Sequence, residues 1–266
     1  MTAPRSGRAT VNGLELYYEV HGEGEPLLLL HGGITVDQTL AQTLPALANA
    51  RQVIVPHMQG HGFTPDIDRP LRFELMADDL AALMAEMGIG SADLVGYSMG
   101  GGIALQTAIR HPTLVDRLVV ISTTMARDGW YPDVVQAFRD MPGNAPAIAA
   151  NIARSPLGDR YPDVNWETLF RKIGEMESEP FDWSADIAGI EAPTMLVFAD
   201  ADAVRPEHIV DFYQRLGGFL RDGGLDGSGR PPGRLAVIPN TTHYDLNDTT
   251  AVAEAILPFL EAFGPN

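Results

Sequence analysis

Apolar residues follow two alternating patterns along this chain of 266 residues. Short continuous apolar runs are typical of strands that helices cover on both faces. Between these runs, apolar side chains recur every three or four residues, which is typical of helices with one buried face. The runs occupy residues 26–30, 52–56, 93–97, 118–122, 192–200 and 235–238, and the helical patterns occupy residues 39–50, 72–87, 99–111, 207–220 and 250–263. The alternation predicts an α/β fold with a mostly parallel central sheet flanked by helices.

The N-terminal end departs from this alternation. Residues 8–11 and 14–20 flank Asn12-Gly13, a dipeptide that strongly favours a two-residue hairpin turn because both positions accept a positive φ. We therefore expect an antiparallel pair of strands before the first buried strand. Near the other end, residues 217–233 are rich in glycine, aspartate and proline, which predicts a long surface loop.

The alternation also stops in the middle of the chain. Residues 125–185 carry many prolines, short amphipathic pieces and all three tryptophans in place of a strand followed by a helix. We predict that this segment is an inserted helical cap, and that residues 1–124 and 186–266 form the core domain.

Composition narrows the class of protein. The 45% of apolar residues suffice for the core of one domain, and the formal net charge of −17 disfavours nucleic acid and anionic membrane surfaces as partners. The absence of cysteine excludes disulfides and a thiol nucleophile. Since no apolar stretch has the character of a signal peptide or a membrane span, we expect a cytoplasmic protein whose partner is a small molecule. The oligomeric state stays open.

The third apolar run ends in a pattern that carries chemistry, Gly96-Tyr97-Ser98-Met99-Gly100. Between a strand and a helix, this pattern predicts a sharp turn that exposes the Ser98 hydroxyl, because side chains at the two glycine positions would clash. The first N–H groups of the following helix, that of Met99 among them, would face the negative charge that develops when a serine attacks a carbonyl group. The alternative is a glycine-rich turn at a helix start.

With these flanks, the chain resembles the α/β-hydrolase family, whose serine branch uses a Ser-Asp-His triad because a serine hydroxyl needs a histidine base and an acid to orient it. Residues 200–206 resemble the family's acid loop, with Ala199 in place of the usual glycine. This resemblance implies Asp202 as the acid, and Asp200 is the alternative. The loop after the last run resembles the family's histidine loop and implies His243 as the base.

A second glycine-containing loop, His31-Gly32-Gly33-Ile34, follows the first buried run. The resemblance implies that the Gly33 N–H joins the Met99 N–H in an oxyanion hole, with Ile34 as the alternative donor. The loop lacks a third glycine. It therefore departs from the family's His-Gly-Gly-Gly form, and bulky esters of tertiary alcohols are not expected substrates.

The segment His57-Met58-Gln59-Gly60-His61-Gly62 supports two interpretations. His57 and His61 could hold a metal ion if they shared a helical face. The surrounding glycines favour a loop instead, and the segment resembles the family's Asp-x-Arg-Gly-His-Gly loop. His57 and Gln59 replace the aspartate and arginine of that pattern, so the loop's usual internal salt bridge is not expected, and neither is a metal site.

The resemblance implies a cofactor-independent serine hydrolase that cleaves a carboxylic ester or a lactone of a small to medium apolar compound through an acyl-enzyme on Ser98. Hydrolysis of a carbon–carbon bond, formation of peracids, cleavage of cyanohydrins, and a non-catalytic ligand-binding role stay open as alternatives. Dehalogenases and epoxide hydrolases use a carboxylate where this chain has Ser98.

Substrate contacts are expected from four residues, two of them in the predicted cap: Ile34, Trp130, Trp166 and Tyr244. The cap's aromatic side chains could equally form its own small core, and we expect one or two of them to line the cleft above Ser98.

Overall fold

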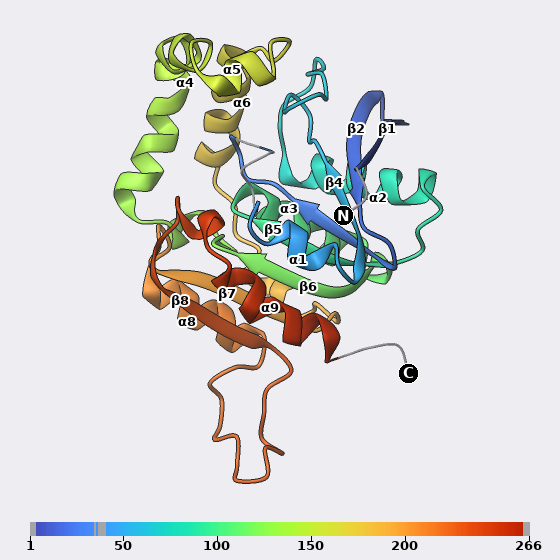
Figure 1. The fold of residues 1–266 in the computed structure, drawn as a ribbon. Coiled ribbons are helices and arrows are strands. Elements are labelled where there is room, and N and C mark those ends of the chain that lie inside the picture. The colour runs from blue at the N-terminus through green and yellow to red at the C-terminus, as the bar shows by residue number, and fades with distance from the viewer. Residues whose placement is uncertain (1–3, 35, 37–40, 263–266) are drawn as a thin grey trace.

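Eight strands form one sheet in the computed structural model, which describes residues 4–34, 36 and 41–262. The strands are β1 (Arg5–Val11), β2 (Leu14–His21), β3 (Glu25–Leu30), β4 (Arg51–Pro56), β5 (Ala92–Tyr97), β6 (Val115–Ile121), β7 (Thr194–Ala201) and β8 (Arg234–Thr242). Their order across the sheet is β1-β2-β4-β3-β5-β6-β7-β8 (Figure 1). The first two pairings, β1 with β2 and β2 with β4, are antiparallel, and the others are parallel. The predicted α/β fold class and the N-terminal hairpin are confirmed.

Helices cover both faces of this sheet. In chain order, the helices of the structure are α1 (Leu44–Leu47), α2 (Phe73–Glu86), α3 (Met99–Arg110), α4 (Pro132–Ile152), α5 (Pro156–Arg160), α6 (Trp166–Ser178), α7 (Ser184–Ile187), α8 (Pro206–Arg215) and α9 (Ala251–Glu261), with short 3₁₀ turns η1 (Pro112–Leu114), η2 (Arg127–Gly129) and η3 (Leu246–Asp248). Strand side chains alternate between two cores, so that Leu28 and Leu30 pack with α2 and α3, whereas Leu27 and Leu29 pack with α1 and α9. In the described part of the chain, no helix combines the length and apolar character that crossing a bilayer requires.

Several predicted boundaries need correction. The helical pattern at residues 39–50 gives only the single turn of α1, because the chain must turn into β4 four residues after α1 ends; residues 39 and 40 lie outside the described residues. Helix α8 ends at Arg215 instead of residue 220, since Gly217 adopts a φ of 83° that no helix continues. Strand β8 is longer than its apolar run, and α9 ends at Glu261, with residue 263 outside the described residues.

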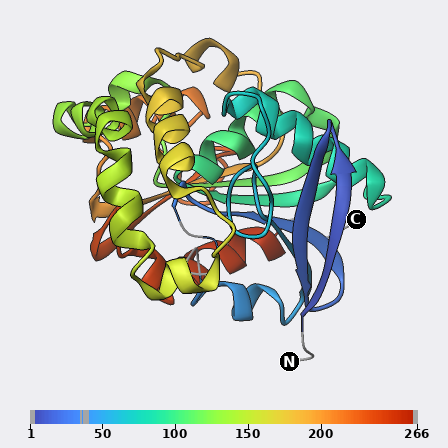
Figure 2. The ribbon, with the colours of Figure 1, turned by 90° about the horizontal axis from the view of Figure 1, so that it is seen from above.

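The segment between β6 and β7 contains η2 and the helices α4 to α7, and it lies over one end of the sheet (Figures 1 and 2). Helices α4 and α6 pack closely at Gly174, where an added Cβ would lie 2.5 Å from Cδ of Pro142. Lys172 of α6 ties the segment to the core, because its ammonium donates to the Asp66 carboxylate and to the carbonyl oxygens of Ile67 and Arg69. The inserted helices are thus fixed to a core loop as well as to each other.

Two glycines inside helices should respond in opposite ways to alanine. An added Cβ at Gly143 of α4 meets no atom within 4 Å, so Gly143→Ala should stabilise the protein by about 0.5–1 kcal/mol through helix propensity. An added Cβ at Gly102 of α3 would lie 2.6 Å from the ring of Phe73, so Gly102→Ala should destabilise it by about 1–3 kcal/mol. Urea unfolding of both variants measures the difference, and equal effects would contradict the packing described for α2 and α3.

Candidate active site

Ser98 occupies the tight turn between β5 and α3. Its φ of 53° and ψ of −119° are strained for a residue with a side chain, and its N–H donates to the Ile121 carbonyl oxygen at 2.9 Å. The flanking glycines have no room for a side chain: an added Cβ would lie 2.2 Å from the Gly100 oxygen at Gly96, and 2.4 Å from the Leu30 oxygen at Gly100. This close approach holds the serine hydroxyl out of the sheet at the start of α3.

His243 follows β8 and reaches the serine. Its Nε2 lies 3.1 Å from Ser98 Oγ, and its Nδ1 lies 3.3 Å from Oδ1 of Asp202. The Tyr97 hydroxyl donates to the backbone oxygen of His243, which fixes the loop that carries the imidazole. A proton on Nδ1 satisfies the carboxylate and leaves Nε2 free to accept the serine proton.

Asp202 is the carboxylate beside the imidazole, whereas Asp200 is exposed and has a different role. Burial opposes ionisation of Asp202, but hydrogen bonds from His243, from Ser122 and from the Ala199 N–H outweigh it and lower the pKa of Asp202. Asp200 accepts the N–H groups of residues 240 and 241, at 2.9 and 3.1 Å. It thereby shapes the turn before His243 without touching the imidazole.

Sequence reasoning missed Ser122. This residue follows β6 with a φ of 51°, its hydroxyl donates to Oδ2 of Asp202, and its N–H donates to the Val197 oxygen at 2.8 Å. It therefore holds the acid in place from the neighbouring strand end. The only signal in the sequence is a small polar residue at the end of a buried run, and that signal is too common to be diagnostic.

The loop after β3 brings Gly33 next to the start of α3, where an added Cβ on Gly33 would lie 3.9 Å from Met99 Cβ. Two buried histidines support this loop. His31 Nδ1 lies 2.7 Å from the Gly32 oxygen, and its Nε2 accepts the Met58 N–H at 3.0 Å. His61 Nε2 lies 3.0 Å from the Gly33 oxygen. Burial lowers the pKa of His31 and of His61, so both act as neutral hydrogen-bonding groups.

The replacements in the loop at residues 57–62 have a structural explanation. His57 Nδ1 accepts the Phe63 N–H at 3.1 Å, and its ring packs against those of Tyr17 and Phe63. The Gln59 amide donates to Asp66 at 2.7 Å and accepts from Arg69 at 2.6 Å. Neutral groups therefore bridge this loop where the family's pattern has an aspartate and an arginine.

Comparison with known proteins agrees with this geometry. A family model described as the alpha/beta hydrolase fold matches residues 25–219. The chain belongs to the α/β-hydrolase family.

Individual relatives of this α/β-hydrolase differ in activity. The 2-hydroxymuconate semialdehyde hydrolase of Pseudomonas sp. (strain CF600) is 36% identical over 126 residues, which are 46% of this chain and less than half, 44%, of that protein. Among solved structures, the enol-lactonase from Burkholderia xenovorans LB400 is 21% identical with a TM-score of 0.72, covering 96% of this chain and 99% of that chain. A thermophilic esterase from Thermogutta terrifontis is 22% identical with a TM-score of 0.74, covering 97% and 98%. At these identities, the two structures share the fold with this chain.

In this α/β-hydrolase, a cavity of about 400 Å³ lies between the inserted helices and Ser98. Of the four expected substrate contacts, Ile34, Trp130 and Tyr244 line it, and Ile34 and Tyr244 are 46% and 75% exposed. The Trp130 ring lies 5.5 Å from the ring of His243, because the chain at Trp130 pairs with Val204 in the acid loop. Phe138 of α4 is the second aromatic side chain that the segment between β6 and β7 contributes to the wall.

The fourth expected contact, Trp166, is not among the residues that line this cavity. It opens α6, seven residues or roughly 10 Å of helix before Ile173, which does line the cavity. Its side chain is 7% exposed and belongs to the apolar core that the inserted helices share with the sheet. Its role in the structure is packing.

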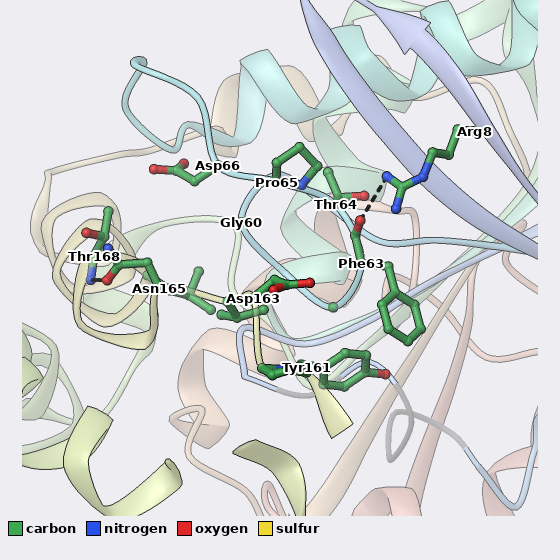
Figure 3. A pocket seen from close by; sticks show the side chains of 14 residues that line it. Arg8, Gly60, Phe63, Thr64, Pro65, Asp66, Tyr161, Asp163, Asn165 and Thr168 are labelled. Carbon is green, nitrogen blue, oxygen red and sulfur yellow. Dashed lines mark hydrogen bonds between the residues drawn. The ribbon is translucent and has the colours of Figure 1, made fainter. Parts of the chain in front are cut away.

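A second cavity, of about 570 Å³, lies between the loop at residues 60–66 and the chain before α6 (Figure 3). Arg8 borders it and donates to the Phe63 oxygen at 3.0 Å, as Figure 3 shows. It is larger than the first cavity, but Ser98, Asp202 and His243 do not line it. The position of these three groups, and not cavity size, identifies the candidate active site.

Trp130→Ala and Trp166→Ala form a matched pair of variants. Trp130→Ala should change the preference among p-nitrophenyl esters of different acyl length, because it removes wall area next to His243. Trp166→Ala should lower the free energy of unfolding by about 3–5 kcal/mol and leave the order of preference unchanged. Acyl-length profiles of kcat/KM and urea unfolding of both variants measure this, and identical profiles for wild type and Trp130→Ala would contradict the assignment of Trp130 to the wall.

Proposed function

We propose that this protein is a cofactor-independent serine hydrolase that cleaves a carboxylic ester or a lactone of a small to medium apolar compound. The observation that carries the proposal is the hydrogen-bonded series from Ser98 through His243 to Asp202, with distances of 3.1 and 3.3 Å. Such a series activates a hydroxyl that is otherwise a poor nucleophile near neutral pH. Family membership supports the same chemistry without identifying the substrate.

In the first half of the proposed reaction, Ser98 Oγ attacks the ester carbonyl carbon while His243 Nε2 accepts the hydroxyl proton. The negative charge on the carbonyl oxygen is stabilised by the N–H groups of Gly33 and Met99. His243 then gives its proton to the departing alkoxide, and the acyl group stays on Ser98. Asp202 keeps its charge throughout and stabilises the imidazolium.

In the second half, a water molecule takes the place of the alcohol. His243 accepts a proton from this water, and the resulting hydroxide attacks the acyl carbon. The same two N–H groups stabilise the second oxyanion, and Ser98 leaves with the proton that His243 returns. A lactone follows the same steps, except that its alcohol stays attached to the acyl group.

The size and lining of the cavity support a small to medium apolar substrate. Its volume of about 400 Å³ lies in the lower part of the range for small-molecule sites. Apolar side chains of α4 form one wall, those of Val134, Ala137, Phe138 and Met141. Burial of apolar substrate surface against them favours binding by roughly 25 cal/mol per Å².

Hydrolysis of a carbon–carbon bond next to a ketone is the second candidate function. The relative from Pseudomonas sp. is named a semialdehyde hydrolase, and that name specifies a substrate other than an ester. An activity screen that includes a vinylogous diketone alongside esters and lactones distinguishes the two candidates. Turnover of the diketone alone would replace ester hydrolysis as the proposed function.

Ser98→Ala should reduce kcat on p-nitrophenyl esters by at least about 10⁴-fold. Its stability should change little, because the hydroxyl contributes little to packing. A fluorophosphonate should label the wild type at Ser98 and leave the variant unlabelled. Near wild-type turnover by the variant, or labelling at another residue, would refute the assignment.

Asp202→Asn and Asp200→Asn test the acid. Asp202→Asn should reduce kcat by about 10⁴-fold, because an amide neither fixes the imidazole tautomer nor stabilises the imidazolium. Asp200→Asn should stay within about tenfold of wild type, because its amide oxygen still accepts one of the two N–H groups that shape the turn, and the side chain does not touch the imidazole. Steady-state kinetics measure kcat of both variants. A larger loss of kcat in Asp200→Asn than in Asp202→Asn would identify Asp200 as the acid.

A further inference from the structure

Glu177 is a buried carboxyl group in the wall of the active-site cavity, and the proposed reaction does not use it. The residue lies in the last turn of α6 and is 5% exposed. It lines the same cavity as Ser98 and His243. Ile173 precedes it by one turn and lies over the oxyanion loop, 3.8 Å from the place of an added Cβ on Gly33. Glu177 is thus about 6 Å further along α6 from that point.

The Glu177 carboxyl is not paired within the described residues. Its Oε2 is buried without a hydrogen-bond partner there. The basic side chains near the end of α6 have other partners, since Arg72 pairs with Glu179 and Arg127 donates to the Ser178 oxygen. Among the described residues, no lysine or arginine lines the cavity. A buried polar atom without a partner is costly, so its retention in a substrate cavity calls for an explanation.

Burial also determines the charge of this group. Loss of hydration raises the pKa of Glu177 to about 8, so that it is a neutral carboxylic acid at neutral pH. A neutral carboxyl donates one hydrogen bond from its hydroxyl and accepts at its carbonyl oxygen. A cationic ligand would have to lose its own hydration and displace this proton, whereas an uncharged oxygen accepts the hydrogen bond directly.

We propose that Glu177 determines substrate specificity by donating a hydrogen bond to an uncharged oxygen, such as that of a ketone, in the otherwise apolar part of the substrate. This proposal rests on the proposed hydrolase function, because it takes the cavity beside Ser98 to be the substrate site. A site that hydrogen-bonds a substrate group discriminates strongly against analogues that lack it, because the protein group is then buried unpaired.

Pairs of p-nitrophenyl esters that differ only in this oxygen test the proposal. They are 4-oxopentanoate against 4-methylpentanoate, 5-oxohexanoate against 5-methylhexanoate, and 6-oxoheptanoate against 6-methylheptanoate. In at least one pair, the wild type should favour the oxo ester by about tenfold or more in kcat/KM. Glu177→Gln, whose amide still donates, should keep the preference, and Glu177→Met, of similar length, should lose it. Equal preference in the wild type and in a folded Glu177→Met would overturn the proposal.

The pH dependence of this preference is a second test, and it does not depend on the folding of Glu177→Met. The other titratable groups that line the cavity are His243, Tyr97, Tyr244 and Asp248, and they affect both esters of a pair alike. The ratio of kcat/KM within the pair should therefore fall in the wild type as pH rises through about 8, where Glu177 loses the donated proton. It should stay level in Glu177→Gln. A ratio that is independent of pH in both proteins would contradict the proposed hydrogen bond.

Binding to Ser98→Ala separates this proposal from the proposed reaction. Calorimetry with the matching anilides, which present the same oxo and methyl groups, measures the difference in binding affinity without turnover. If no ester is hydrolysed but the oxo anilide still binds more tightly than the methyl anilide, the proposed reaction is wrong and the proposed role of Glu177 is supported. If esters are hydrolysed but no oxo preference exists, only the role of Glu177 fails. The wild type could instead prefer the p-nitrophenyl ester of 6-aminohexanoate, which carries a cation. If Glu177→Gln abolished that preference, the ligand of Glu177 would be a cation and the proposal of an uncharged oxygen would be wrong.

Discussion

The contact of backbone with backbone at the start of α3 is the constraint on which this site depends. The oxygen of Gly100 lies where a side chain of Gly96 would be, and the oxygen of Leu30 lies where one of Gly100 would be. Three elements, β3, β5 and α3, therefore meet at van der Waals distance around Ser98. This contact forces the serine into a strained conformation, and it also places the loop after β3 against the start of the helix. The positions of Ser98 and of both proposed oxyanion donors thus depend on two glycines.

Neutral and charged polar groups are distributed around this point in a consistent way. The histidines that support the loop after β3 are buried and neutral, and so is Glu177 in the wall of the cavity. Asp202 is the buried carboxylate that keeps its charge, because Ser122, His243 and a backbone N–H all donate to it. A single stabilised negative charge next to the imidazole favours the imidazolium that the proposed reaction requires.

Much of this arrangement could be predicted from the sequence, for identifiable reasons. Continuous apolar runs indicate the strands, and the turn around Ser98 can be predicted because only glycine fits on either side of it. The choice between Asp202 and Asp200 depended on the resemblance to the family's acid loop, because the sequence alone does not distinguish two aspartates that are separated by one residue. Ser122, Phe138 and Glu177 were missed because their roles arise from segments far apart in the chain. Trp166 was placed in the wrong environment because its distance along α6 from the cavity becomes visible only when the helix start is known.

The attachments of α6 have a consequence for the shape of the binding space. Lys172, which is 11% exposed, holds one part of this helix to the core loop, and Arg127 and Arg72 hold its end. The start of α4 is attached to the core as well, because the chain at Trp130 pairs with Val204 and the Tyr131 N–H donates to the Ala203 oxygen at 3.1 Å. Both walls of the cavity are therefore anchored to loops of the core. The width of the space between α4 and α6 is set by these attachments, so molecules too wide for it should be excluded.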